Sequence, residues 1–335
     1  MNTEPDVEKW LADNNVRWLD GDELLYRLPP EGINETMLEE IFLHRAEMAN
    51  SLRRYQSERP AGSSMDSHLL LRQPLHRRFE LYAQMTPGAV AIKFDHTELT
   101  YGELDNQSDG LAVLLQQLGF GPGQFCALYL DRSIATLRAI LAIWKAGGAY
   151  VPLAPMLPAE RIATMLSATG VRAVITQENL YERLPETDAQ MILCGEDTAD
   201  VPYSWPQEHP TEGVAPAYAI CTFRATDRPS IVVSRSMDVL KRLESMQETS
   251  PIHEGDSVLR NTNCSLDVSA WELLWPLLHG ARLVIPPTRE ESDFQCMRHL
   301  ISREHITVMH VVPTIQEALP TASVHGEAEL SPRFV

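Results

Sequence analysis

From Leu75 onward, segments with helical spacing of apolar residues alternate with short, continuous apolar runs. Residues 125–130, 171–176, 191–194 and 257–259 form runs that are typical of buried strands. The helical stripes consist of Leu111, Leu114, Leu115 and Leu118, and of Ile134, Leu137, Leu141 and Trp144. This alternation predicts an α/β layered fold around largely buried sheets, and the stripes are expected to lie in the core.

Composition narrows the class of protein. With 335 residues, of which 44% are hydrophobic, the chain has material for a core and for more than one domain. No apolar run approaches the ~20 residues that span a bilayer, and the first residues, MNTEPDVEKW, do not resemble a signal peptide, so we expect a cytoplasmic protein. The net charge of −18 argues against nucleic-acid and membrane partners.

The cysteines and histidines give no sign of a metal or catalytic centre. The five cysteines lack the C-x-x-C spacing of a zinc site or redox motif, and we expect no disulfide framework. The histidines show no spacing typical of metal ligands or of a catalytic triad. We therefore expect no metal.

A linker separates two predicted domains. Residues 58–73 are rich in Ser, Pro, Gly and charge, which favours an exposed connection between residues 1–57 and 74–335. In the first domain, apolar patterning predicts a helix, then a hairpin of residues 16–19 and 24–28, then one or two helices within 34–54. The first domain is therefore predicted to be a small α+β unit.

Residues 217–234, AYAICTFRATDRPSIVVS, form an apolar run followed by a turn. A loop that cradles phosphates needs glycines that let backbone N–H groups approach the anion, hydroxyl donors and a lysine. Thr222 and Thr226 supply hydroxyls, but the turn has no glycine, and Asp227 repels phosphate by roughly 1 kcal/mol or more at a few ångströms. The alternative is an ordinary strand-turn-strand.

Three further segments accompany this one in a fixed order: LTYGEL (99–104), WKAGGAYVPLAP (144–155) and LDVSAWELLWPLLHGARLVIPP (266–287). Together the four segments resemble the core motifs of the amino-acid adenylation domains of nonribosomal peptide synthetases, over residues 75–314. In that family the third motif reads YTSGSTGRPKG, and Thr222, Thr226, Arg228 and Pro229 keep its pattern. The family's Ser, three Gly and Lys fall on Phe223, Arg224, Asp227, Ile231 and Ser230.

The resemblance also implies what lies beyond residue 314. The family continues with an adenine-stacking motif, an Asp for the ribose hydroxyls and a mobile C-terminal domain that carries the catalytic Lys, whereas this sequence ends at Val335. The resemblance thus implies a truncated, degenerate adenylation-like domain, the N-terminal subdomain of the adenylate-forming fold. We expect no catalytic residue, no cofactor and no ATP-dependent adenylation by this polypeptide alone.

The fourth segment is the best preserved of the four. By the resemblance, Asp267 matches the residue that binds the substrate's α-ammonium, and Val268, Trp271 and His310 match pocket positions of a serine-type specificity code. We interpret the pocket as vestigial, because an isolated Asp–ammonium pair contributes only ~0 to 1 kcal/mol. The spacing of Ser269 and Glu272 predicts a capping box at the start of a helix.

Residues 1–57 resemble the tubulysin-type N-terminal docking domain of the same synthetases, through WLADNNVRW, GDELLYRLP and IFLHRAEM. The resemblance implies that the exposed hairpin edge accepts the C-terminal peptide of an upstream synthetase as an added strand. Six basic against twelve acidic residues give this domain a charge of −6, which favours a basic peptide. The predicted docking residues are Trp18, Leu24, Leu25, Tyr26 and Arg27.

Three functions remain open. In the first, the chain is a noncatalytic component of an assembly line. In the second, it is an adenylating enzyme, either completed by another polypeptide or binding nucleotide through Arg224 and Arg228. In the third, it is a remnant of a longer synthetase. A sheet cut after the predicted strand 306–312 leaves an apolar edge, so we expect a neighbouring assembly-line domain or a homodimer partner to cover it.

Overall fold

The structure is a computed structural model that describes residues 16–18, 24–26, 74–195, 206, 215–223, 229–260, 267–286, 294–309 and 333–334. The chain divides into two compact units, Met1–Leu70 and Leu71–Val335. The domain boundaries expected from the sequence, at residues 57 and 73, stay predictions.

The described part of the first unit is a pair of short strands. Strand β1 (Val16–Trp18) pairs antiparallel with β2 (Leu24–Tyr26), and Arg17 lies opposite Leu25. Both strands fall within the segments expected to form a hairpin.

Two six-stranded sheets form the second unit. The first sheet is parallel except for its β9–β10 pair, and the second is parallel except for its β3–β4 pair. In spatial order the first sheet contains β10 (Pro229–Arg235), β9 (Pro216–Phe223), β6 (Ala149–Pro152), β5 (Phe125–Tyr129), β7 (Ala173–Thr176) and β8 (Gln190–Leu193). The second contains β14 (Arg333–Phe334), β13 (Val308–Met309), β11 (Ser257–Leu259), β12 (Arg282–Ile285), β3 (Val90–Phe94) and β4 (Thr97–Thr100).

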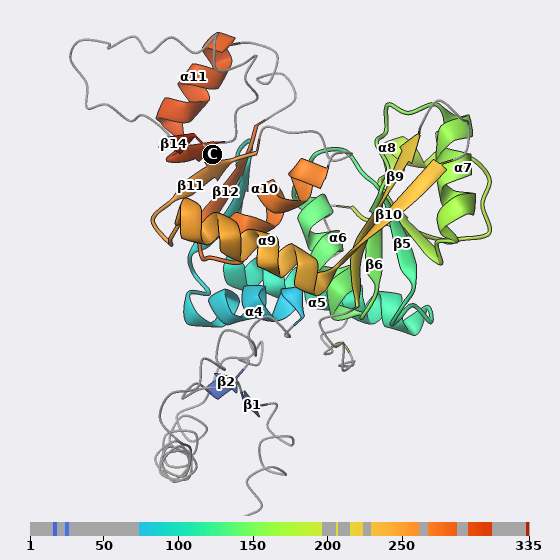
Figure 1. The fold of residues 1–335 in the computed structure, drawn as a ribbon, viewed down its shortest axis with the longest axis horizontal. Helices are drawn as coiled ribbons and strands as arrows, with labels where there is room; N and C mark the ends of the chain where they lie inside the picture. Colours follow the sequence, from blue (N-terminus) through green and yellow to red (C-terminus); the bar gives the residue numbers. More distant parts are fainter. Residues whose placement is uncertain are drawn as a thin grey trace, which may run out of the picture. The chain divides into compact units, whose positions relative to one another are not determined.

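Helices surround and separate these sheets (Figure 1). They are α4 (Leu75–Met85), α5 (Tyr101–Gln117), α6 (Ile134–Lys145), α7 (Ala159–Thr169), α8 (Glu178–Tyr181), α9 (Ser236–Thr249), α10 (Asp267–Leu277) and α11 (Phe294–Arg303). The predicted stripes lie on α5 and α6, whose residues Leu111, Leu115, Leu137 and Leu141 are buried.

Three apolar clusters define the layers. The largest joins residues of both sheets with α4, α5, α6, α9 and α10, so these helices lie between the sheets, as Figure 1 shows. A second cluster packs α7 against the other face of the first sheet, and a third packs α11 against the other face of the second. Burial of both faces explains why the parallel strands are continuous apolar runs. The predicted α/β layered fold is confirmed.

The edge at β13 differs from the expectation. Val308 and Met309 pair with Arg333 and Phe334 of β14, so this strand has a neighbour on each side within the described residues. The prediction of an open edge after residues 306–312 was wrong at these two positions, because a segment more than twenty residues further along the chain returns to the sheet. Among the described helices, none has the length and apolar character that crossing a membrane requires.

Candidate functional site

The segment predicted as a degenerate phosphate loop joins the two strands of the β9–β10 hairpin. Thr222 lies opposite Ser230 and Phe223 lies opposite Pro229, which brackets the turn at residues 224–228. The Thr222 hydroxyl donates to the carbonyl oxygen of Ser230 at 3.3 Å. The predicted strand at 217–221 is confirmed, since it lies within β9. Arg224, Thr226, Asp227 and Arg228 lie outside the described residues, so their roles stay predictions.

Phe223 is anchored at the base of this turn. Its half-buried ring packs against the cluster formed by α7 and the first sheet, and the guanidinium carbon of Arg161 lies 5.1 Å from the ring centroid. Arg161 belongs to the first turn of α7 and is exposed. A cation over an aromatic face is attracted by the ring quadrupole, so this contact ties the hairpin to α7.

The second motif, WKAGGAYVPLAP (144–155), contacts the start of β9. The Trp144 indole N–H donates to the Ala217 carbonyl at 2.9 Å, and the rings of Tyr150 and Tyr218 lie 5.5 Å apart on neighbouring strands. Gly148 of the same motif leaves room for Phe120, since a Cβ at residue 148 would overlap the Phe120 ring. The motif therefore positions the hairpin through packing and one buried hydrogen bond.

The first motif, LTYGEL (99–104), connects β4 of the second sheet to α5. Thr100 and Glu103 form a capping box, in which the Thr100 side chain accepts from the Glu103 N–H and the Glu103 carboxylate accepts from the Thr100 N–H. The Tyr101 hydroxyl donates to the Ala281 carbonyl at 2.8 Å, and burial raises the pKa of this phenol. The T-x-x-E spacing in LTYGEL indicates this cap, but the sequence analysis did not use it.

The fourth motif forms α10. This helix begins at Asp267, so Ser269 lies within its first turn and not before it, and the prediction of a capping box at Ser269 was wrong. Trp271 is 7% exposed and meets Trp275 edge-on with ring centroids 6.3 Å apart. The side chains of Asp267 and Val268 and the whole of His310 lie outside the described residues. From the bounds of α10, Asp267 and Val268 lie in the first turn of the helix, and Trp271 follows four residues after Asp267.

The predicted docking residues belong to the first unit. Trp18 lies on β1 opposite Leu24, and Leu25 and Tyr26 follow on β2. Arg27 lies outside the described residues, and the roles of all five residues stay predictions.

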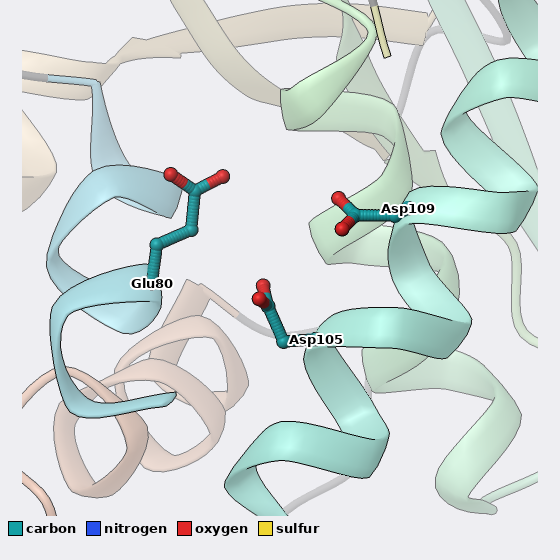
Figure 2. Close-up of side chains that lie close together, drawn as sticks. All are labelled: Glu80, Asp105 and Asp109. Carbon is teal, nitrogen blue, oxygen red and sulfur yellow. The ribbon is translucent and has the colours of Figure 1, made fainter. Parts of the chain in front are cut away.

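A buried charged cluster that was not predicted from the sequence lies among α4, α5 and α6 (Figure 2). Carboxylate oxygens of Glu80, Asp105 and Asp109 lie within 4.8 Å of one another, an arrangement that can hold a metal ion. The Lys145 ammonium, however, lies 2.5 Å from Asp105 and 2.9 Å from Asp109, and all four side chains are buried. Lys145 thus supplies the positive charge that a metal would bring, and the cluster acts as a structural ion-pair network. The i, i+4 spacing of the two aspartates was the available signal.

The structure describes the side chains of three of the five cysteines. Cys126 and Cys194 are buried, Cys221 is partly exposed, and none of the three forms a disulfide. Burial raises the pKa of the Cys126 and Cys221 thiols. Neither thiol is therefore an activated nucleophile.

Comparison with known proteins shows one family over most of the chain. Residues 79–333 match the model of the family described as AMP-binding enzyme. The chain is 34% identical to a dimodular nonribosomal peptide synthase of Bacillus subtilis (strain 168), over 74% of its own length and 11% of that protein. It is also 34% identical to tyrocidine synthase 3 of Brevibacillus parabrevis, over 74% of this chain and 4% of that protein. The chain thus spans only a small part of these relatives.

A solved structure agrees with this match. The N-terminal subdomain of NpsA from Klebsiella oxytoca superposes with a TM-score of 0.65 at 26% identity, over 72% of this chain and 62% of that one.

Proposed function

Because the chain belongs to the AMP-binding enzyme family, as part of an adenylation domain of the nonribosomal peptide synthetase type, we propose that it is a noncatalytic component of a nonribosomal peptide assembly line. In this role the N-terminal unit docks an upstream synthetase in the cytoplasm, and the adenylation fragment serves as a scaffold or interaction surface.

The β9–β10 hairpin carries the proposal. Its turn contains no glycine, and Ser230 stands where the family has the lysine that neutralises phosphate charge. The ring of Phe223, which falls where the family has a Ser, packs against the cluster of α7 and the first sheet. A loop without glycine reaches positive φ less readily, so its backbone N–H groups turn toward a phosphate less easily, and Asp227 repels the anion. These features support the loss of ATP binding.

Calorimetry with ATP and serine tests this part of the proposal. We expect no saturable heat from the whole chain with either ligand. A matched variant, D227G/S230K, returns one glycine and the lysine to the loop, and we expect its ATP affinity to be at least that of the unmodified chain. Saturable ATP binding by the unmodified protein contradicts the noncatalytic role.

The docking role rests on the first unit. Strands β1 and β2 form a two-stranded antiparallel sheet, and such a hairpin can accept an added strand along either edge through backbone hydrogen bonds. The charge of −6 over residues 1–57 supports a peptide partner with a basic C-terminus. The docking role is tested by titration with basic C-terminal peptides of synthetases, and acidic peptides of equal length are the control. Absence of binding to every basic tail contradicts the docking role.

One observation favours a second candidate, a split adenylating enzyme with a serine-like pocket. Asp267 and Val268 begin α10, and the buried Trp271 follows on the same helix, so three positions that the resemblance assigns to the serine-type code lie on one helix. The remaining pocket positions and the catalytic Lys then come from another polypeptide. Mixing the chain with such a polypeptide and measuring serine-dependent pyrophosphate release distinguishes the candidates. The noncatalytic role predicts no release above that of the added polypeptide alone.

A further inference from the structure

Strand β10 is the outermost strand of the first sheet (Figure 1). It pairs antiparallel with β9 along one edge, and no other described strand pairs with its second edge. The register with β9 runs without interruption from Pro229 to Ser234, and the first irregularity comes between Ser234 and Arg235. The outer edge therefore presents a regular row of backbone N–H and C=O groups.

Three adjacent β-branched residues line this edge strand. Ile231 is 38% exposed, Val232 is 53% exposed and Val233 is 45% exposed. Since successive side chains of a strand point to opposite faces, Val232 and its two neighbours expose apolar surface on both faces at once. Helices α7 and α9 contact β10 and still leave these three side chains accessible.

The edge lacks the features by which proteins prevent strand pairing. Residues 230–234 contain no charged residue, no proline and no bulge. Natural edge strands are usually shortened, charged, interrupted by proline or covered. An apolar edge to which no described strand is paired can take up the strand of another chain.

The sequence of β10 matches a second copy of itself. In an antiparallel pair centred on Val232, Ser230 lies opposite Ser234 of the other copy and Ile231 lies opposite its Val233. Every residue of this segment then meets its own chemical kind, with β-branched pairs in the middle and hydroxyls at both ends. Such a contact is isologous, so two copies close it and no further copy can add.

We propose that the outer edge of β10 joins two copies of this chain in an antiparallel pair centred on Val232. The dimer is weak, because an edge of seven residues provides less than the ~1,200 Å² that stable interfaces bury. The net charge of −18 opposes association of two copies, so added salt strengthens the dimer.

Sedimentation velocity of the whole chain over a range of concentrations tests the dimer. We expect a reversible monomer–dimer equilibrium whose dissociation constant falls when salt is added. Val232→Lys places two ammonium groups at the symmetry axis and abolishes the dimer. The matched control is Leu193→Lys on β8, the opposite edge of the same sheet, where Leu193 is 51% exposed; this variant dimerises like the unmodified chain.

Cysteine cross-linking tests the register and does not depend on the lysine variant. Directly opposed residues of an antiparallel pair have Cα atoms about 4.5–5.5 Å apart, within the range of a disulfide. Val232→Cys therefore forms a covalent dimer under mild oxidation, whereas Ile231→Cys does not, since its counterpart lies two positions away. The unmodified chain is the control, because it measures the background cross-linking through its own five cysteines.

Three results overturn the proposal. One is a chain that stays monomeric at every concentration, even if it binds a different polypeptide. Another is a dimer that survives Val232→Lys, and the third is equal cross-linking of both cysteine variants.

Discussion

The Lys145 ammonium lies 2.5 Å from the Asp105 carboxylate, and both side chains are almost fully buried between α5 and α6. The same ammonium donates to Asp109 at 2.9 Å and to the Asp105 carbonyl at 3.1 Å. One cation thus satisfies several acceptors in a region of low dielectric constant. Removal of that cation leaves two buried aspartates with less compensation, whereas Glu80 keeps its ion pair with Arg77 at 3.0 Å.

Replacement of Lys145 by Met is therefore expected to lower the free energy of unfolding by about 3–5 kcal/mol. Urea denaturation measures it. The control is Arg235→Met, because Arg235 pairs with the half-exposed Asp238 and its loss costs about 1 kcal/mol or less. Equal losses for the two variants contradict the assigned role of Lys145.

Replacement of Gly148 by Ala is expected to destabilise the chain by about 1–3 kcal/mol. The new Cβ overlaps the Phe120 ring and lies 3.0 Å from the Gln124 carbonyl oxygen, and Phe120 is itself buried. Gly88→Ala is the matched control, since no atom lies within 4 Å of its new Cβ. Thermal unfolding of the two variants compares them, and an unchanged midpoint for Gly148→Ala refutes the close contact.

The contact between Arg161 and Phe223 is expected to contribute about 0.5–1 kcal/mol. A double-mutant cycle with Arg161→Ala and Phe223→Leu isolates this coupling from the loss of packing. The β9–β10 hairpin is the segment affected, so hydrogen exchange of β9 amides should rise in Arg161→Ala. A coupling energy of zero would show that the Arg161 guanidinium and the Phe223 ring do not interact in solution.

Glu304 is expected to make stability depend on pH in the acid range. Burial raises the pKa of its carboxyl, but hydrogen bonds from Arg303 at 2.8 Å and an ion pair with Lys93 at 3.2 Å outweigh burial, so the pKa lies below its ordinary value of 4.5. The stabilisation is fully present above pH 4.5 and is lost as the pH falls through the lowered pKa.

Replacement of Glu304 by Gln should therefore cost about 1–2 kcal/mol at neutral pH, and the difference from the unmodified chain should shrink as the pH falls below 4.5 through the lowered pKa. Urea denaturation at several pH values measures the difference. Glu98→Gln, which removes the more exposed partner of Lys93, should cost at most about 1 kcal/mol at neutral pH. A pH-independent loss for Glu304→Gln contradicts the argument.

Local patterns in the sequence were enough for several elements of the second unit. The apolar runs at 125–130, 171–176 and 257–259 correspond to β5, β7 and β11, because a strand buried on both faces needs little besides β-branched and aliphatic residues. The start of α10 was misplaced by three residues, since an N-cap at Ser269 puts the first helical residue at 270. A side chain can cap a helix only where the backbone enters it, and spacing alone does not reveal that point.

The sequence by itself determined the α/β class, the order of the elements and the absence of glycine in the turn of the β9–β10 hairpin, since each of these is a property of residues close together along the chain. Only the tertiary structure decided that Lys145 lies among Asp105 and Asp109, that Arg161 covers Phe223, and that β14 returns to β13. These contacts join residues separated by more than twenty positions, and which of the possible partners meet depends on how the two sheets pack around the shared layer of helices.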